Sequence, residues 1–137
     1  SIVLSDIDHF KSINDQYGHA CGDHVLTRAA AILRDRIRDI DRLGRWGGEE
    51  FILLLPETES DGAALLAEKL RDTIGDNVFD FQGQRLSITM TLGVATFRKG
   101  ETLEACIARA DAALYEGKAA GRNRVMVGGA QGISAVT

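Results

Sequence analysis

Arg45-Trp46-Gly47-Gly48-Glu49-Glu50-Phe51 leads directly into the apolar run of residues 52–55, and this stretch decides the fold. The two glycines predict a tight turn, because a residue without a Cβ adopts backbone conformations that other residues resist. The apolar run predicts a buried strand after that turn. Two adjacent carboxylates at the turn have two interpretations: an exposed hairpin that happens to carry acids, or a site that holds a divalent cation.

The residues before this hairpin predict one strand and two helices. A short apolar strand covers residues 2–4, and a helix over residues 10–17 ends at Gly18. A longer helix starts at about Asp23 and has four inward-facing residues at helical spacing: Leu26, Ala30, Leu33 and Ile37. Residues 41–46 then form the first strand of the hairpin, and Pro56 ends the second.

The residues after the hairpin continue the alternation of helices and strands. Ser60 or Asp61 can cap a third helix, a strand near residues 78–81 follows, and residues 86–94 alternate as one half-buried strand. A last helix over residues 103–119 and a strand over residues 124–127 precede a flexible tail, residues 128–137. The residues expected to face inward from these two helices are Ala63, Leu66, Ala67, Leu70 and Ile74, then Leu103, Ile107, Ala110 and Leu114.

Because two of the connections are hairpins, the pattern favours an α+β fold, an α/β two-layer sandwich with a mixed, largely antiparallel sheet flanked by helices. The length of 137 residues fits one domain, which we place at residues 1–127. A net charge of −4 argues against a protein that binds nucleic acid through a basic face.

The chain contains no apolar run of transmembrane length and no signal peptide pattern. Its two cysteines, Cys21 and Cys106, lie far apart, and we expect both to be reduced in a cytoplasmic setting.

Acidic residues occur at two places that the topology can bring together. Asp6 and Asp8 end the first strand, and Glu49 and Glu50 lie at the hairpin turn. If the first strand lies beside the hairpin, Asp6 and the two glutamates converge on one edge. Hard oxygen ligands with open positions suit Mg²⁺ bound to a nucleoside triphosphate.

Two further pairs of residues suit the base and the phosphates of such a nucleotide. Asn14 and Asp23 offer an amide and a carboxylate, which match the donors and the acceptor on the edge of guanine. Lys118 and Arg122 offer charge for phosphates. Each has an ordinary alternative: Asp23 as a helix N-cap, Asn14 on a solvated face, and the two cations at a helix C-terminus.

Four segments together resemble the GGDEF domain of diguanylate cyclases. They are residues 6–19 (DIDHFKSINDQYGH), Gly22-Asp23, residues 47–51 (GGEEF) and residues 114–123 (LYEGKAAGRN). The resemblance runs from residue 2 to about 127 and implies a fold similar to nucleotidyl cyclases and the polymerase palm. It implies that two GTP condense to cyclic di-GMP with release of two pyrophosphates. The family accepts Glu49 in place of the Asp of the eponymous motif.

The resemblance also implies a role for individual residues. Asp6, the Ile7 carbonyl and Glu49 would bind Mg²⁺ or Mn²⁺, with Glu50 completing the acidic pair, and Glu49 would accept the proton of the attacking 3′-hydroxyl. Substrate contacts would come from Asn14 and Asp23 on guanine, Lys118 and Arg122 on phosphates, and Phe10, Lys11 and His19 around them. Because the product is two-fold symmetric, a homodimer is the simplest catalytic arrangement.

A second site is expected at Arg38-Asp39-Ile40-Asp41, which resembles the Arg-x-x-Asp motif of product inhibition in the family. Arginine binds guanine O6 and N7 bidentately. Lys69 falls where many members have a supporting arginine, but lysine lacks the planar fork. The alternative is that Arg38 and Asp41 are ordinary charges at a helix exit.

The family domain normally starts with a helix and an Asp-x-Leu-Thr-Gly-Leu-like segment, and neither precedes Ser1. We therefore expect a longer parent chain with an upstream sensor domain, which is compatible with a membrane anchor. Three other functions are alternatives: a receptor for GTP or cyclic di-GMP without activity, a mononucleotide cyclase, and a structural dimerisation module. The intact Glu49 and Glu50 favour the diguanylate cyclase.

Overall fold

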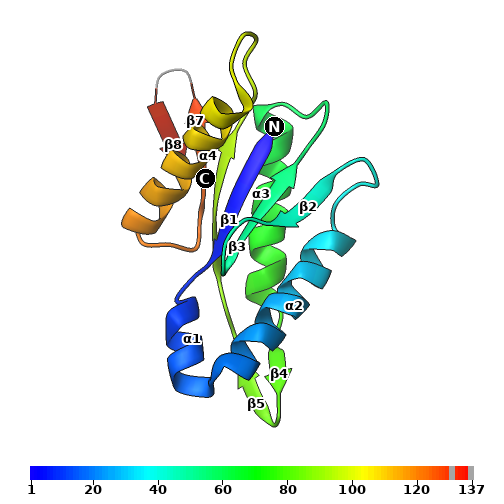
Figure 1. Cartoon of the computed structure of the whole chain (residues 1–137), viewed down its shortest axis with the longest axis vertical. Coiled ribbons are helices and arrows are strands. Elements are labelled where there is room, and N and C mark those ends of the chain that lie inside the picture. Colours follow the sequence, from blue (N-terminus) through cyan, green and yellow to red (C-terminus); the bar gives the residue numbers. More distant parts are fainter. Residues whose placement is uncertain (130–131, 136–137) are drawn as a thin grey trace.

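The computed structural model describes residues 1–129 and 132–135. Helices and strands alternate along this part of the chain (Figure 1). In chain order they are β1 (Ile2–Ile7), α1 (Phe10–Tyr17), α2 (His19–Asp35), β2 (Arg42–Arg45), β3 (Glu50–Leu54), α3 (Ser60–Asp76), β4 (Phe79–Phe81), β5 (Gln84–Leu86), β6 (Met90–Ala95), α4 (Leu103–Ala119), β7 (Val125–Gly129) and β8 (Gly132–Ala135).

The main sheet has the strand order β2-β3-β1-β6-β7-β8, and β4 and β5 form a separate hairpin. Neighbouring strands are antiparallel except for β6 and β7, which are parallel. The prediction of a mixed, largely antiparallel sheet is therefore confirmed. No helix in the described residues is both long and apolar enough to cross a membrane.

Alternation along β1 places its side chains on two faces of the sheet. Val3 and Ile7 belong to the large core that α2 and α3 complete, whereas Ile2 and Leu4 pack in a smaller core with α4. Helix α4 thus adds a layer to the two-layer arrangement expected from the sequence. Because side chains alternate with a period of two, Asp6 lies on the same face as α4.

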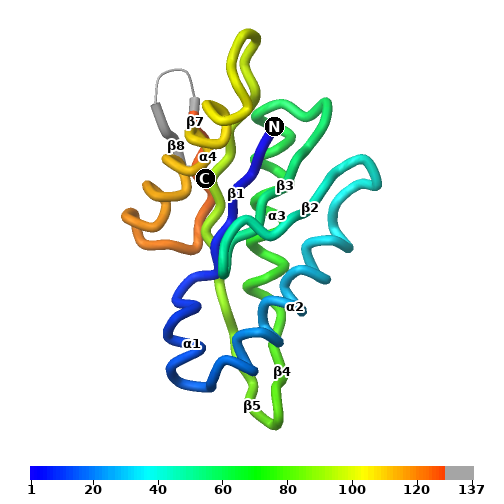
Figure 2. Tube along the Cα trace, viewed as in Figure 1, coloured from blue at the N-terminus to red at the C-terminus, as the bar shows by residue number. Residues whose placement is uncertain are grey.

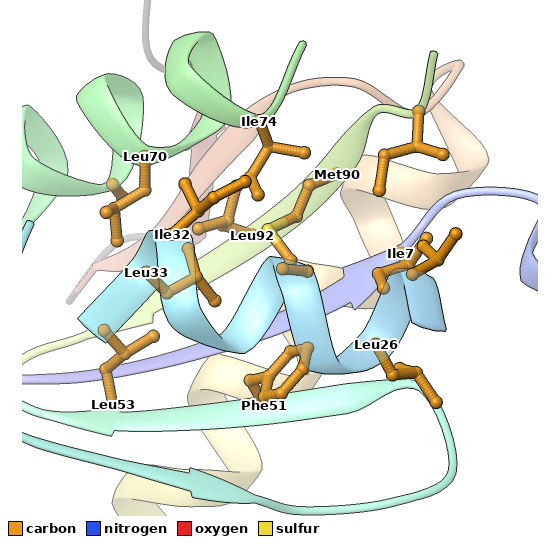
Figure 3. Packing of buried hydrophobic residues seen from close by; sticks show 14 of the residues in the cluster. Ile7, Leu26, Ile32, Leu33, Phe51, Leu53, Leu70, Ile74, Met90 and Leu92 are labelled. Atoms are coloured by element: carbon orange, nitrogen blue, oxygen red, sulfur yellow. The ribbon is translucent and has the colours of Figure 1, made fainter. Parts of the chain in front are cut away.

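The large core holds the two helices of one face against the sheet (Figure 3). Leu26 and Leu33 of α2 and Leu70 and Ile74 of α3 are buried, as their helical spacing predicts. From the sheet, Phe51 of β3 is among the largest fully buried side chains. This packing fixes the hairpin that carries the two glutamates.

Helix α4 approaches β6 so closely that two positions require glycine. A Cβ on Gly93 would lie 2.2 Å from the Ala110 carbonyl oxygen, and one on Gly117 would lie 2.7 Å from Thr91 Cγ2. Such distances are far below van der Waals contact, so a side chain at either position would push the helix away from the sheet. The close approach brings the C-terminal end of α4 to the edge where β1 ends.

Several sequence-based expectations need correction. Helix α2 begins at His19, so Asp23 lies inside the helix and is not its N-cap. Residues 86–94 do not form one strand, because β5 ends at Leu86 in the small hairpin and β6 begins at Met90. Leu103, the first residue of α4, is 51% exposed and does not face inward.

The start of α3 differs from expectation, and the C-terminal segment contains regular structure. The N-cap of α3 is Glu59, without a side-chain bond, and Ser60 and Asp61 are already helical. Within the segment expected to be a flexible tail, Gly129 ends β7 and Gly132–Ala135 forms β8, which pairs with it. Residues 130–131 and 136–137 of the expected tail lie outside the described residues.

Candidate active site

The end of β1 and the turn between β2 and β3 meet at one edge of the sheet. Asp6 is paired with Glu50 in the antiparallel register, and the Ile7 N–H donates to the Glu49 carbonyl oxygen at 3.3 Å. Figure 2 shows this turn beside the point where β1 leads into α1. The expected convergence of Asp6 with the two glutamates is thus present.

The turn itself is held by main-chain bonds and by one arginine. The N–H groups of Trp46 and Gly47 both donate to the Glu50 carbonyl oxygen, at 2.9 and 3.4 Å. Arg45 donates from Nη2 to the Gly48 carbonyl oxygen at 2.7 Å. Arg45 is not predictable as part of the site from the motif alone, although its position two residues before the glycines is one from which a long donor can reach back to the turn.

A cavity of about 230 Å³ opens where these elements meet. It brings together seven of the expected site residues, with Asp8, His9 and Ser12 between them. Glu50, Asn14, Asp23 and His19 are not among its lining residues. The seven are Asp6, Ile7, Phe10, Lys11, Glu49, Lys118 and Arg122.

Asp6 is a buried carboxylate with a cation as its partner. It is 4% exposed, and the Lys118 ammonium donates to its Oδ2. Burial raises the pKa of Asp6 from its usual 3.8 to about 6; Lys118 acts in the opposite direction, while Glu49 and Glu50 raise it further. The charges of Asp6, Glu49 and Glu50 thus lie near one another, and Lys118 is the cation in direct contact with Asp6.

This environment predicts how stability depends on pH. Because the folded pKa of Asp6 lies above its unfolded value, its contribution to stability is present below pH 3.8 and is lost as the pH rises to about 6. Asp6→Asn has no such loss. Without metal, the melting temperature of Asp6→Asn relative to wild type is expected to rise between about pH 4 and about pH 7. Asp15→Asn, which changes an exposed acid of α1, is the control. If the melting temperatures of wild type and Asp6→Asn depended on pH in the same way, the raised pKa of Asp6 would be refuted.

The donor set of the cavity fits a metal ion that shares its coordination with substrate. Among the residues that the structure describes, no three His, Cys, Asp or Glu side chains gather closely enough to hold a metal alone. Mg²⁺ is commonly bound through one or two carboxylates, with phosphates and waters supplying the rest. Asp6 and Glu49 meet that requirement, and the Lys118 ammonium against Asp6 shows that the carboxylate accommodates a cation.

Helices α1 and α2 form a second part of the candidate site. Gly18 joins them with φ +92°, a conformation that favours glycine. Asn14 Oδ1 is buried and has no hydrogen-bond partner, the one such side-chain atom among the described residues. Asp23 and His19 are exposed on α2. A buried acceptor without a donor is costly, and a donor from a ligand would remove that cost.

Gly22 provides the space for Asn14. A Cβ on Gly22 would lie 1.9 Å from Asn14 Oδ1 and 3.1 Å from Phe10 Cζ. We expect Gly22→Ala to displace the Asn14 amide. If GTP is the ligand, as the sequence resemblance implies, its KM should rise roughly 5- to 150-fold, the equivalent of about 1–3 kcal/mol for one buried hydrogen bond. Helix α2 should persist, because alanine is the better helix former.

Gly75→Ala is the matched control, since Gly75 is also helical and has open space around its Cα. Both variants are compared with wild type in GTP titrations and in thermal melts. A Gly22→Ala variant with the wild-type KM would show that the Asn14 amide does not contact the base.

Asp8 has a different environment from Asp6, although it directly follows β1. It is buried and accepts hydrogen bonds from Thr89 Oγ1 and Thr91 Oγ1, each at 2.6 Å, and from the Asn123 N–H at 3.0 Å. Three donors occupy its two oxygens. Sequence reasoning could not assign these partners, because they lie more than 80 positions away in the chain.

A second cavity of about 250 Å³ lies between the end of α2 and the first half of α3. Arg38, Asp41 and Lys69, the three residues named for a possible second site, all line it, and it shares no lining residue with the first cavity. Arg38 donates from Nη2 to Asp41 Oδ1 at 3.0 Å and to Thr58 Oγ1 at 2.7 Å. Arg36, Thr58, Gly62, Leu65 and Leu66 complete the lining.

Comparison with known proteins agrees with this geometry. Residues 1–124 match the family model described as "Diguanylate cyclase, GGDEF domain". Diguanylate cyclase DgcP of Pseudomonas aeruginosa is 48% identical over 126 residues, which are 92% of this chain and 19% of that protein. The chain thus spans about a fifth of the length of this relative.

Two solved structures have the same fold. The GGDEF domain of DgcB from Caulobacter crescentus, in complex with c-di-GMP, has a TM-score of 0.89 at 33% identity and covers 93% of this chain and 76% of its own. The active GGEEF domain of a diguanylate cyclase from Vibrio cholerae has a TM-score of 0.86 at 38% identity, with 93% and 81% covered.

Proposed function

The chain belongs to the GGDEF-domain family of diguanylate cyclases, and from that premise we propose that it condenses two GTP into cyclic di-GMP with release of two pyrophosphates. The observation that carries the proposal is a single cavity that joins the Asp6 and Glu49 carboxylates to the cations Lys118 and Arg122. This combination suits a metal-bound triphosphate.

In this proposal the acidic residues act at the reacting phosphate. Asp6, the Ile7 carbonyl and Glu49 hold Mg²⁺ or Mn²⁺, and Glu50 completes the acidic pair. The bound metal supplies neutralisation of the charge on the phosphates. Glu49 accepts the proton from the attacking 3′-hydroxyl as that oxygen bonds to the α-phosphorus and pyrophosphate leaves. The GGEEF form of the signature is thus proposed to be active.

The remaining residues bind and orient GTP. Lys118 and Arg122 bind phosphate oxygens. The orphan Asn14 acceptor and the Asp23 carboxylate read the donors of guanine, and the burial of Asn14 supports this assignment. Phe10, Lys11 and His19 surround the nucleotide. Since one domain holds one GTP and the product is two-fold symmetric, catalysis takes place between two copies in a C2 dimer.

The setting of the domain follows from its substrate and its relatives. We infer a cytoplasmic location, where GTP is available and where the free, buried Cys21 and Cys106 stay reduced. The matched relative is much longer than this chain, which supports a parent protein with an upstream sensor domain.

Incubation of the purified chain with GTP and Mg²⁺, followed by identification of products by mass, tests the proposal. Cyclic di-GMP is the expected product. Tight binding of GTP without turnover would instead establish a receptor, and cyclic GMP would establish a mononucleotide cyclase.

A further inference from the structure

The turn that follows α4 has an unusual backbone. Arg122 and Asn123 are consecutive non-glycine residues with φ +64° and φ +47°. Left-handed conformations are unfavourable for residues with a Cβ, and they persist only where the surroundings over-determine them. Arg122 lines the first cavity, so whatever fixes this turn also fixes a cation at the candidate site.

The main chain of the turn is anchored on two sides. The Arg122 N–H donates to the Gly117 carbonyl oxygen at 3.0 Å, which ties the turn to α4. The Asn123 N–H donates to Asp8 Oδ2 at 3.0 Å and to Thr91 Oγ1 at 3.1 Å, which ties it to the ends of β1 and β6. These bonds come from elements that already line or border the cavity.

The side chain of Asn123 is held from a helix outside the cavity. Arg71 of α3 donates from Nη1 to Asn123 Oδ1 at 2.8 Å, across 52 positions of sequence. The guanidinium is itself oriented by Glu68, which accepts from Nε at 2.8 Å, and by Asp72, which accepts from Nη2 at 2.9 Å. Arg71 is 21% exposed and is not among the residues that line either cavity.

We propose that Arg71 is a positioning residue for Arg122: it fixes Asn123 and so sets the direction in which Arg122 enters the phosphate region. The role of Arg122 as a phosphate ligand rests on the proposed function. The contact by which Arg71 holds Asn123 does not depend on that function. Lysine cannot replace Arg71, because the planar fork bonds Glu68 and Asn123 at the same time and an ammonium does not have that geometry.

The kinetic test compares Arg71→Met with wild type in steady-state GTP turnover. Arg71→Met is expected to raise KM about tenfold and to change kcat much less, because a misplaced phosphate ligand removes binding that ground state and transition state share. Arg85→Met is the control: Arg85 also pairs with an acid, Asp80, but lies in the β4–β5 hairpin. It should leave KM unchanged.

A double-mutant cycle with Arg122→Ala separates positioning from general damage to the fold. If Arg71 acts through Arg122, Arg71→Met changes KM less than about twofold once Arg122 is absent. The same factor in both backgrounds, or a wild-type KM in the single variant, overturns the proposal.

Hydrogen exchange of the Asn123 amide provides a readout that does not need activity. Protection should fall in Arg71→Met and persist in Arg85→Met. If wild type makes no cyclic di-GMP, the proposed function fails while exchange still decides whether Arg71 holds the turn. Unchanged protection in Arg71→Met refutes the inference whatever the kinetics, and lost protection with an unchanged KM refutes the positioning of Arg122.

Discussion

Glu49→Gln is expected to lower the rate of cyclic di-GMP formation by a factor on the order of 10³ or more, because one change removes both a proposed metal ligand and the proposed general base. The half-buried Glu49 lines the cavity beside Asp6, and its main-chain oxygen receives the Ile7 N–H. The amide keeps the size of the side chain and leaves that main-chain bond intact. Turnover is measured with Mg²⁺ present by separating the nucleotide products.

The melting temperature should change little in Glu49→Gln, since its side chain is outside both hydrophobic clusters. Glu104→Gln is the matched control, an exposed glutamate in the first turn of α4 that should keep the wild-type rate. Asp6→Asn should be as inactive as Glu49→Gln. If Glu49→Gln turned over GTP at the wild-type rate, the proton acceptor would have to be another residue.

The approach of Asp6 to Glu49 and Glu50 was predictable, because it depends on local sequence signals and on the pairing of β1 with β3. The apolar run of β1 ends in acids, the two glycines mark the hairpin, and a hairpin beside β1 is enough to bring Asp6 opposite Glu50. Lys118 was predictable through its place at the end of a long amphipathic helix. The pattern thus predicted that these side chains meet at one edge, but not the contacts that each of them makes.

The rest of the site depends on contacts that no local pattern encodes. The alternation over residues 86–94 predicts one strand, yet tertiary packing divides this segment between two sheets. Thr89 and Thr91, which lie in this segment, donate hydrogen bonds to Asp8. Arg71 reaches Asn123 only because α3 lies against β6 and β7. Similarly, the inward face of α4 was extended to Leu103 because helical spacing alone does not show where the sheet ends.

Arg38→Lys is expected to relieve inhibition by cyclic di-GMP while leaving uninhibited turnover largely unchanged. The Arg38 side chain is 54% exposed at the mouth of the second cavity, where its planar fork can bind guanine O6 and N7 bidentately, which lysine cannot. The lysine retains a cation near Asp41, whose side chain is fully buried. Arg38→Ala should relieve inhibition as well, but it leaves that buried acid without its side-chain partner and should lower the melting temperature.

The second cavity can influence catalysis because Asp41 directly precedes β2, and β2 leads into the turn that carries Glu49. A product molecule bound there inhibits only if it binds a restrained hairpin, or a non-productive pairing of domains, more tightly than the active arrangement, since equal affinity shifts nothing.

Lys69→Arg, which adds a second planar fork to the same cavity, should tighten inhibition. Turnover is measured against added cyclic di-GMP for wild type, Arg38→Lys, Arg38→Ala and Lys69→Arg. Superimposable inhibition curves for wild type and both Arg38 variants would mean that Arg38 is a structural partner of Asp41 and that the product acts elsewhere.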